Sequence, residues 1–387
     1  MKTKQKLLIL LFLLILISCR EERNIYIPDE VIVEPLDTTA EDINSPRKIK
    51  GFYLLNEGNM GSNKATLDYF DYETQIYSRN IFAYANPSVV KEMGDVGNDL
   101  KIYGGRLYAV INCSNKIDIM DKWTAIKIGQ INIPNCRYIR FHEGFAYVTS
   151  YAGPVEINPD YKQSGYVAKV DTATLQVVDR CLVGFQPDEL EIVDNKIYVA
   201  NSGGYMFPNY ENTVSVIDIE TFTEIKQIEI AVNLHRLRAD KHGNLWVSSR
   251  GDYYNTPSRL FCIDTKTDKL TDELAISVSN FHLDGDSLYI YSTEWNYLNM
   301  NNVITYGIVD VVKKELVTNN FITDGTEKNI RVPYGISVHP ITKDIYVTDA
   351  KNYVSPGTLY CFDKNGKQKW KSIRTGDIPA HFTFLEE

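Results

Sequence analysis

Seven short segments of the sequence carry polar residues that could bind a ligand or do chemistry. The segments are GNDLK, NCRYI, PDELEI, LHRLRA, FHLDG, YGISVH and AHFTF, and they contain Asp99, Arg137, Asp188, His235, His282, Tyr334 and His381. Imidazole, guanidinium and carboxylate groups bind metals, form ion pairs or transfer protons. If the segments are equivalent strands of a repeat, these side chains converge on one axis, at or near the rim of a central funnel.

The histidines among these residues are candidates for metal binding or catalysis. His235, His282 and His381 could hold a metal, but they lie on separate segments and no carboxylate spacing completes a defined shell. The sequence contains no GxSxG or HExxH motif and no paired catalytic carboxylates. We therefore expect neither an enzyme nor a bound metal or cofactor, and we interpret Arg137 with Asp188 as an ion pair. A hydrolase or lyase with a metal on the axis is the alternative.

A second group of residues is aromatic and lies in loops. The segments 57–64, 112–115, 150–165, 201–212, 249–258, 292–302 and 349–357 hold Tyr151, Tyr161, Tyr205, Phe207, Tyr210, Tyr253, Tyr254, Trp295, Tyr297 and Tyr353. Tyrosine and tryptophan offer broad contact area with a polar handle, and large rings in solvated loops indicate a covered surface. We expect about half of these rings to pack against neighbouring loops and the others to contact a bulky, partly apolar ligand.

An internal repeat of about 40 to 55 residues positions both groups. One strand of each copy carries an aromatic at a fixed place: Tyr53, Tyr108, Tyr147, Tyr198, Trp246, Tyr289 and Tyr346. The next strand ends in an aspartate that is expected to cap a turn: Asp71, Asp121, Asp171, Asp218, Asp264, Asp310 and Asp363. Four short alternating strands per copy predict an all-β, seven-bladed β-propeller over residues 51–387.

The two ends of the repeat predict how the ring closes. The first copy starts at GFYLLNEG without an inner strand, and the chain ends in IPAHFTFL, which reads as an inner strand lacking its blade. The C-terminal strand should therefore complete blade one. The loops between second and third strands should then share one face with the starts of the inner strands.

The N-terminal residues predict export and a lipid anchor. Lys2, Lys4 and Lys6 precede an apolar run, Leu7–Ile17, that is too short to span a bilayer. We interpret residues 1–18 as a lipoprotein signal peptide, Cys19 as the lipidated residue and 19–50 as a flexible tether. The acidic pair just after Cys19 resembles the export signal of surface lipoproteins, so we expect display on the cell surface at the outer membrane.

Charge and cysteine content exclude other classes. The net charge of −9 and the pI near 5.3 argue against nucleic-acid binding. Besides Cys19, five cysteines without CxxC spacing imply no zinc site and no disulfide framework. Cys262 and Cys361 occupy matching strand positions and are expected in the core. A disulfide between Cys113 and Cys136 is an alternative that the sequence does not decide.

Several segments resemble a known family. YVANSGG, NTVSVIDIETFTEIKQI and NLHRLRADKHGNLWVSSRG resemble the YncE-like propellers, and GFYLLNEGNMGSNKATLDYFD resembles their surface-lipoprotein branch. Together with the lipoprotein signal that ends at Cys19, these segments make the chain similar to the surface cobalamin-binding lipoproteins. The resemblance implies capture of cobalamin (vitamin B12) or another corrinoid, and a TonB-dependent outer-membrane cobalamin transporter as partner.

The expected function is therefore non-catalytic capture of a bulky ligand on the loop face of the propeller. Glycan or protein binding at the cell surface is a further alternative, because aromatic platforms also stack on sugars. The expected ligand-binding residues are Arg137, Tyr151, Asp188, Tyr205, Phe207, His235, Tyr253, Tyr254, His282, Trp295, Tyr297, Tyr334, Tyr353 and His381.

Overall fold

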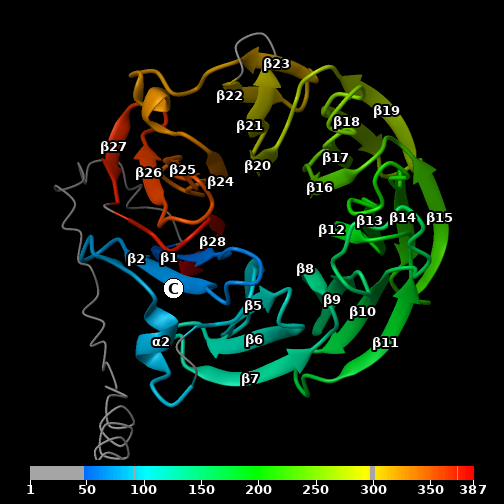
Figure 1. Ribbon diagram of the computed structural model, residues 1–387, viewed down its shortest axis with the longest axis horizontal. Helices are drawn as coiled ribbons and strands as arrows, with labels where there is room; N and C mark the ends of the chain where they lie inside the picture. The colour runs from blue at the N-terminus through cyan, green and yellow to red at the C-terminus, as the bar shows by residue number, and fades with distance from the viewer. Residues whose placement is uncertain (1–47, 90–91, 297–300, 373) are drawn as a thin grey trace, which may run out of the picture.

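The computed structural model describes residues 48–89, 92–296, 301–372 and 374–387. Seven four-stranded antiparallel sheets stand around a central axis as the blades of a propeller (Figure 1). The predicted seven-bladed β-propeller is thus confirmed. The predicted signal peptide, Cys19 and the tether up to residue 47, together with Tyr297, lie outside the described residues.

The strands follow the same order in every blade, from the channel outwards. The inner strands are β28 (Pro379–Glu386), β4 (Gly97–Tyr103), β8 (Cys136–His142), β12 (Pro187–Val193), β16 (Leu234–Ala239), β20 (Asn280–Asp284) and β24 (Pro333–Val338). The second strands are β1 (Ile49–Asn56), β5 (Arg106–Ile111), β9 (Phe145–Ser150), β13 (Lys196–Asn201), β17 (Asn244–Ser249), β21 (Ser287–Asn296) and β25 (Ile345–Asp349).

The third strands are β2 (Thr66–Asp71), β6 (Lys116–Asp121), β10 (Tyr166–Asp171), β14 (Thr213–Asp218), β18 (Arg259–Asp264), β22 (Asn301–Asp310) and β26 (Thr358–Phe362). The outer strands are β3 (Tyr77–Ser78), β7 (Lys127–Asn132), β11 (Val177–Leu182), β15 (Thr223–Glu229), β19 (Lys269–Leu274), β23 (Glu315–Thr318) and β27 (Gln368–Lys371). Two short helical segments, α2 (Ile81–Ala85) and η2 (Thr326–Asn329), lie between blades.

The repeated aromatics of the second strands form the core between blades. Six of the seven are buried, and Tyr289 is partly buried. Successive hydrophobic clusters combine residues of neighbouring blades, as where Tyr198 packs with Leu245 and Val247. Each blade therefore stabilises the next, as the repeat predicted.

The aspartate that ends each third strand caps the following turn. Asp71 accepts hydrogen bonds from the amide and hydroxyl of Thr74, and Asp218 accepts the equivalent pair from Thr221. The other five aspartates accept amide bonds from residues two to four positions ahead. The predicted turn role is confirmed in all seven blades.

The C-terminal strand closes the ring as predicted. β28 is the inner strand of blade one and pairs antiparallel with β1, which begins at Ile49, two residues before the predicted start of the propeller. Phe382 and Phe384 of β28 pack on Tyr346, a core residue of blade seven. The two ends of the chain are thus joined within one blade and packed against the last one.

One loop prediction is wrong. Residues 292–302 were expected to form a loop, but β21 and β22 extend through most of this stretch and pair up to Asn296 and Asn301. Trp295 therefore belongs to a strand, opposite Asn302. Thr293 and Val303 also lie in the paired part of these two strands. The asparagines clustered in this stretch obscured the strand pattern.

The described cysteines are free thiols, so the possible Cys113–Cys136 disulfide is not formed. Cys262 and Cys361 are fully buried in strands, which confirms their predicted place in the core. Among the described residues, no helix is long and apolar enough to cross a membrane.

The fold predicts a loss of stability on mild acidification. His339, buried after β24, accepts amide hydrogen bonds from Ile341 and Thr342 at Nδ1. Burial and the charges of Lys369 and Lys343 lower its pKa from 6.5 to about 4. The unfolded chain binds this proton more tightly, so stability falls as pH decreases from about 6.5 towards about 4.

The measurement is the urea midpoint at pH 7 and at about pH 5. His339→Asn keeps a neutral acceptor for the two amides and should show a smaller fall, with the remainder contributed by His282 and His235, whose pKa values are also lowered. An equal fall in variant and wild type would contradict this assignment.

Candidate functional site

The strand register places two rings of side chains around the channel. The residues opposite the repeated aromatics form the lower ring: Lys101, Arg140, Glu191, Arg238, His282, Ser337 and Thr383. Two positions earlier on the inner strands lies the upper ring: Asp99, Tyr138, Glu189, Arg236, Asn280 and His381, with Gly335, which has no side chain, at the seventh position. Because strand side chains alternate, both rings face the channel.

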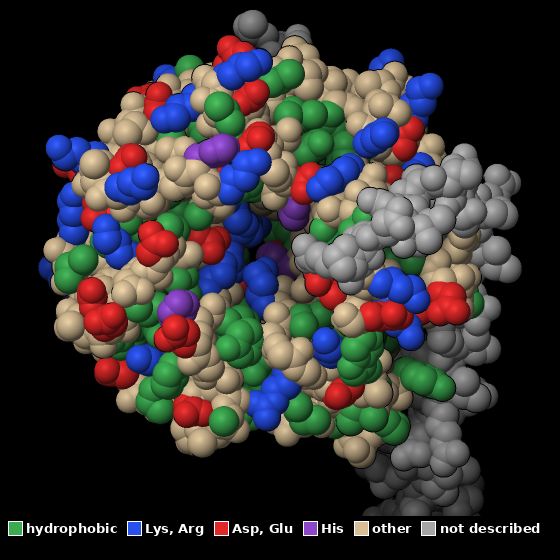
Figure 2. Space-filling model, turned by 180° about the vertical axis from the view of Figure 1, so that it is seen from behind, with side chains coloured by type: hydrophobic (Ala, Val, Ile, Leu, Met, Phe, Trp, Pro, Cys, Tyr) green, Lys and Arg blue, Asp and Glu red, His purple; other side chains and the backbone are tan. Residues whose placement is uncertain are grey.

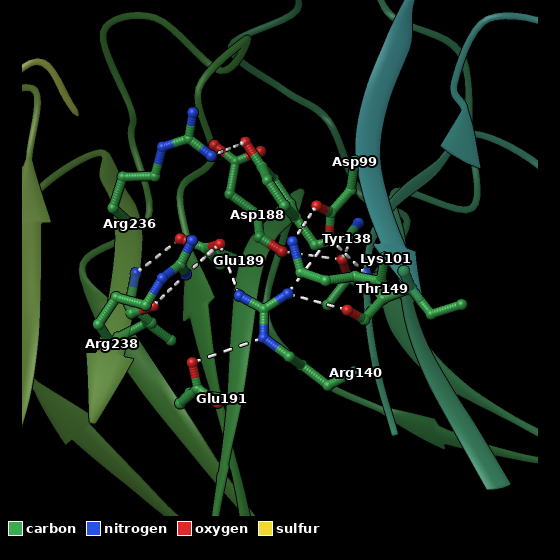
Figure 3. Close-up of polar contacts among 12 residues, drawn as sticks. Asp99, Lys101, Tyr138, Arg140, Thr149, Asp188, Glu189, Glu191, Arg236 and Arg238 are labelled. Carbon is green, nitrogen blue, oxygen red and sulfur yellow. Dashed lines mark hydrogen bonds and ion pairs between the residues drawn. The ribbon is translucent and has the colours of Figure 1, made fainter. Parts of the chain in front are cut away.

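The two rings are joined by a network of ion pairs (Figure 3). Arg140 contacts Asp99 at 3.2 Å, Glu189 at 2.8 Å and Glu191 at 3.5 Å. Glu189 also pairs with Arg238 and accepts the amide of Leu237. Burial alone would raise the pKa of Glu189, but Arg238 and Arg140 lower it to about 2. Charged side chains thereby join four inner strands: β4, β8, β12 and β16.

Above the upper ring, the channel widens into a mouth cavity of about 670 Å³. Six of the connections from second to third strand contribute to its wall: Glu57, Asn112, Val155, Tyr205, Arg250 and Tyr353. In blade six the contribution comes from Thr293 on the extended strand β21. The inner strands add Arg137, His235 and Tyr334. The predicted sharing of one face by loops and inner-strand starts is therefore correct.

Amides, guanidinium groups and tyrosines dominate the wall of the mouth cavity. Asn59, Asn98, Asn112 and Asn280 supply the amides, and three arginines, Arg137, Arg236 and Arg250, supply the cations. We call these three residues the mouth arginines. Such a wall can donate many hydrogen bonds while its rings contact apolar surface.

Asp188 fixes two of the mouth arginines. Its carboxylate accepts hydrogen bonds from Arg137 at 3.0 and 3.2 Å, from Arg250 at 3.0 Å and from the hydroxyl of Tyr151 at 2.9 Å. The predicted Arg137–Asp188 pair is confirmed, but Asp188 is fully buried rather than on the rim. Tyr151 is also buried, so it positions Asp188 instead of lining the cavity.

The three channel histidines lie at different depths. His235 lines the mouth cavity, whereas His282 lines two lower cavities of about 300 and 530 Å³. Burial and Arg238 lower the pKa of His282 to about 3, so it is neutral near pH 7. His381 Nε2 lies 2.9 Å from Glu57, which also accepts the hydroxyl of Tyr334. Within the described ranges, no three His, Cys, Asp or Glu side chains are grouped to bind a metal.

Among the described side chains, four exposed rings stand on the loops around the mouth: Phe207, Tyr253, Tyr254 and Tyr353. We call them the rim aromatics. Phe207 contacts Tyr254 at 5.5 Å between ring centroids, and Tyr353 contacts Tyr334 at 6.0 Å. Tyr161, like Tyr151, is buried, and Tyr205 and Tyr210 are partly buried. The loop rings thus divide into packed and exposed sets, as expected.

The predicted site residues did not include Arg236, Arg250 or the four wall asparagines. Arg236 adjoins the predicted His235, and its alternation with Arg238 in LHRLRA was the available signal for a channel-facing pair. The basic character of the channel was hidden by the acidic net charge. Figure 2 shows Lys and Arg side chains gathered around the hollow at the centre of one face.

Comparison with known structures supports the fold. The chain is similar to hydrazine synthase of Kuenenia stuttgartiensis, with a TM-score of 0.56 and 14% identity over 70% of this chain and 77% of that one. It is also similar to a quinonprotein alcohol dehydrogenase-like protein of Bacteroides thetaiotaomicron, with a TM-score of 0.55 and 13% identity over 87% and 79%. At these identities the likeness concerns the fold alone.

No curated protein matches the sequence. A family model does match residues 50–384, which is nearly the whole propeller from β1 to β28. The chain therefore belongs to the family described as a domain of unknown function, DUF5074.

Proposed function

We infer that this protein is a non-catalytic capture protein that binds a corrinoid, with cobalamin as the specific candidate, at the mouth cavity. Its lipid anchor at Cys19 would hold it on the outer membrane, beside a TonB-dependent cobalamin transporter that receives the vitamin. The YncE-like resemblance and the N-terminal residues support the location and the partner. The ligand class is supported by the chemistry of the cavity.

The single observation that carries the proposal is the composition of the mouth cavity. A corrinoid is a broad, partly apolar macrocycle fringed with amide side chains, so its recognition needs hydrogen-bonding groups around an open hollow. The cavity offers about 670 Å³, with Asn98, Asn112 and Asn280 in its wall. Because the blades hold every wall segment, the site is preformed and little ordering is needed on binding.

The rim aromatics extend the site beyond the cavity. Tyr353 lines the cavity and is 44% exposed, so one face of its ring is available to a ligand. Phe207 and Tyr254 form a contacting pair on neighbouring loops. A ligand larger than the cavity would lie across the mouth and cover these rings, which removes apolar surface from water.

The exposed rings also favour a second candidate, a surface glycan-binding protein. Sugar rings present apolar faces that stack on tyrosine, and Tyr253 and Tyr254 are 61% and 69% exposed. This candidate explains the rim but makes less use of the charged and amide groups inside the mouth cavity.

The test is calorimetric titration of the purified protein with cyanocobalamin. We expect saturable binding, weakened about tenfold or more by Tyr353→Ala and by Tyr254→Ala, because truncating a central aromatic contact costs about 1–3 kcal/mol. Tyr84→Ala is the matched control, since Tyr84 is 74% exposed on α2 and lines no part of the mouth cavity.

Absence of heat at micromolar protein would reject the corrinoid. Saturation by a soluble oligosaccharide in the same experiment would establish the glycan candidate instead. Equal weakening by Tyr84→Ala and Tyr353→Ala would show that the site lies elsewhere.

A further inference from the structure

The mouth of the channel carries more positive than negative charge. Asp188 is the carboxylate that pairs with Arg137 and Arg250, and among the described residues no carboxylate lies within ion-pair distance of Arg236. Glu57, the acidic residue in the cavity wall, is already engaged by His381 and Tyr334. Of the three guanidinium groups in this partly enclosed space, two share one carboxylate and the third has no described carboxylate within ion-pair distance.

Arg236 is the least satisfied of the mouth arginines. Its side chain is 8% exposed, yet its Nε has no hydrogen-bond partner among the described residues. Nη1 donates to the hydroxyl of Tyr138 at 2.9 Å, and the guanidinium lies over the Tyr138 ring (Figure 3). Glu189 is close enough to act on its charge, but that carboxylate is bound by Arg140 and Arg238. A buried cation without a direct counter-charge is costly.

His235 lies beside Arg236 and is affected by the same excess of positive charge. It is 8% exposed, and its Nδ1 has no partner in the described part of the chain. Burial and the charges of the mouth arginines hold the pKa of His235 well below its ordinary value. The imidazole is therefore neutral; its Nε2 lies 3.4 Å from the hydroxyl of Tyr138, and its ring forms part of the cavity wall beside Arg236.

We propose that the mouth arginines form a subsite for an oxyanion, which is the phosphodiester group of the captured ligand. Guanidinium groups bind phosphoryl oxygens through paired, charge-assisted hydrogen bonds. The phosphodiester supplies the counter-charge that Arg236 lacks, while Asp188 keeps Arg137 and Arg250 in place. This inference rests on the proposed function, because it assigns the anionic group of a corrinoid bound at the mouth cavity.

The test compares two corrinoids on wild type and on Arg236→Met. Cyanocobalamin contains the phosphodiester and dicyanocobinamide does not. We expect Arg236→Met to weaken cyanocobalamin binding about tenfold or more and to change dicyanocobinamide binding by less than about twofold. Arg259→Met is the matched control, because Arg259 pairs with Glu273 and lines no part of the mouth cavity. Thermal unfolding of each variant checks that the propeller is intact.

Equal binding of cyanocobalamin by wild type and Arg236→Met would overturn the subsite while leaving corrinoid capture standing. If neither corrinoid binds, the oxyanion subsite is tested by thermal unfolding in inorganic phosphate. The control is thermal unfolding in chloride at equal ionic strength. A saturable rise of the unfolding midpoint in wild type, absent in Arg236→Met, would support the oxyanion site although the proposed function had failed. No rise would reject both.

Discussion

Deletion of residues 379–387 is expected to abolish cooperative folding. These residues contain β28, which supplies the inner strand of blade one and pairs with β1 along its length. Their loss removes buried Leu385 and the rings of Phe382 and Phe384, which pack on Phe52 and Tyr346. Loss of a buried leucine costs about 2–5 kcal/mol, and the two partly buried rings add to this cost, against a total stability of about 5–15 kcal/mol for a typical protein.

The measurement is thermal unfolding followed by circular dichroism, together with limited proteolysis at 25 °C. Deletion of Glu387 alone is the control, because this residue follows β28 and its pairing with Lys48 is exposed. A truncated protein that unfolds cooperatively within a few degrees of wild type would show that the other six blades close without this strand.

Substitution of Asp188 by alanine is expected to destabilise the protein by about 3–5 kcal/mol, because it leaves buried charge without its partner. Asp188 is fully buried and joins three consecutive blades through Arg137 on β8, its own strand β12, and Arg250 after β17. The change also removes the acceptor of the Tyr151 hydroxyl. Chemical denaturation gives the free energy of unfolding.

Two further variants separate charge from hydrogen bonding. Asp188→Asn keeps an oxygen for Tyr151 and one arginine but loses the charge, so its destabilisation should be intermediate. Asp160→Ala removes an exposed carboxylate of the same face and should change stability by less than about 0.5 kcal/mol. A loss below about 1 kcal/mol for Asp188→Ala would mean that water replaces the carboxylate.

The fold was predictable because its signals are repeated and local. An aromatic in each second strand and an aspartate after each third strand recur at fixed spacing, and each has a physical role that one sequence reveals. Ring closure followed from the unpaired first and last segments. The hairpin of β21 and β22 was mistaken for a loop because Asn296, Asn301 and Asn302 suggested a turn over a longer stretch than the structure uses.

The site was predictable only in part because it depends on register between blades. The inner-strand starts correctly indicated Arg137, His235 and Tyr334 as mouth residues. A shift of one or two residues along an inner strand decides whether a polar side chain lies in the cavity, beneath it or farther down the channel. His282 and Asp188 illustrate this, since both were assigned to the rim and lie deeper.

The surplus of arginine at the mouth needed three-dimensional information. Arg137, Arg236 and Arg250 come from separate segments, and only Arg137 and Arg250 pair with Asp188, which becomes visible when the blades are assembled. The acidic net charge of −9 gave no sign of a basic hollow. Local charge in a propeller channel is set by a few inner positions, which contribute little to the total composition.

A structure of the protein with cyanocobalamin would test the central claim most directly. We expect the corrin ring over the mouth cavity, against Tyr353, with the phosphodiester within hydrogen-bond distance of Arg236. A corrinoid bound on the opposite face or on the outer strands, or none bound at saturating concentration, would contradict it.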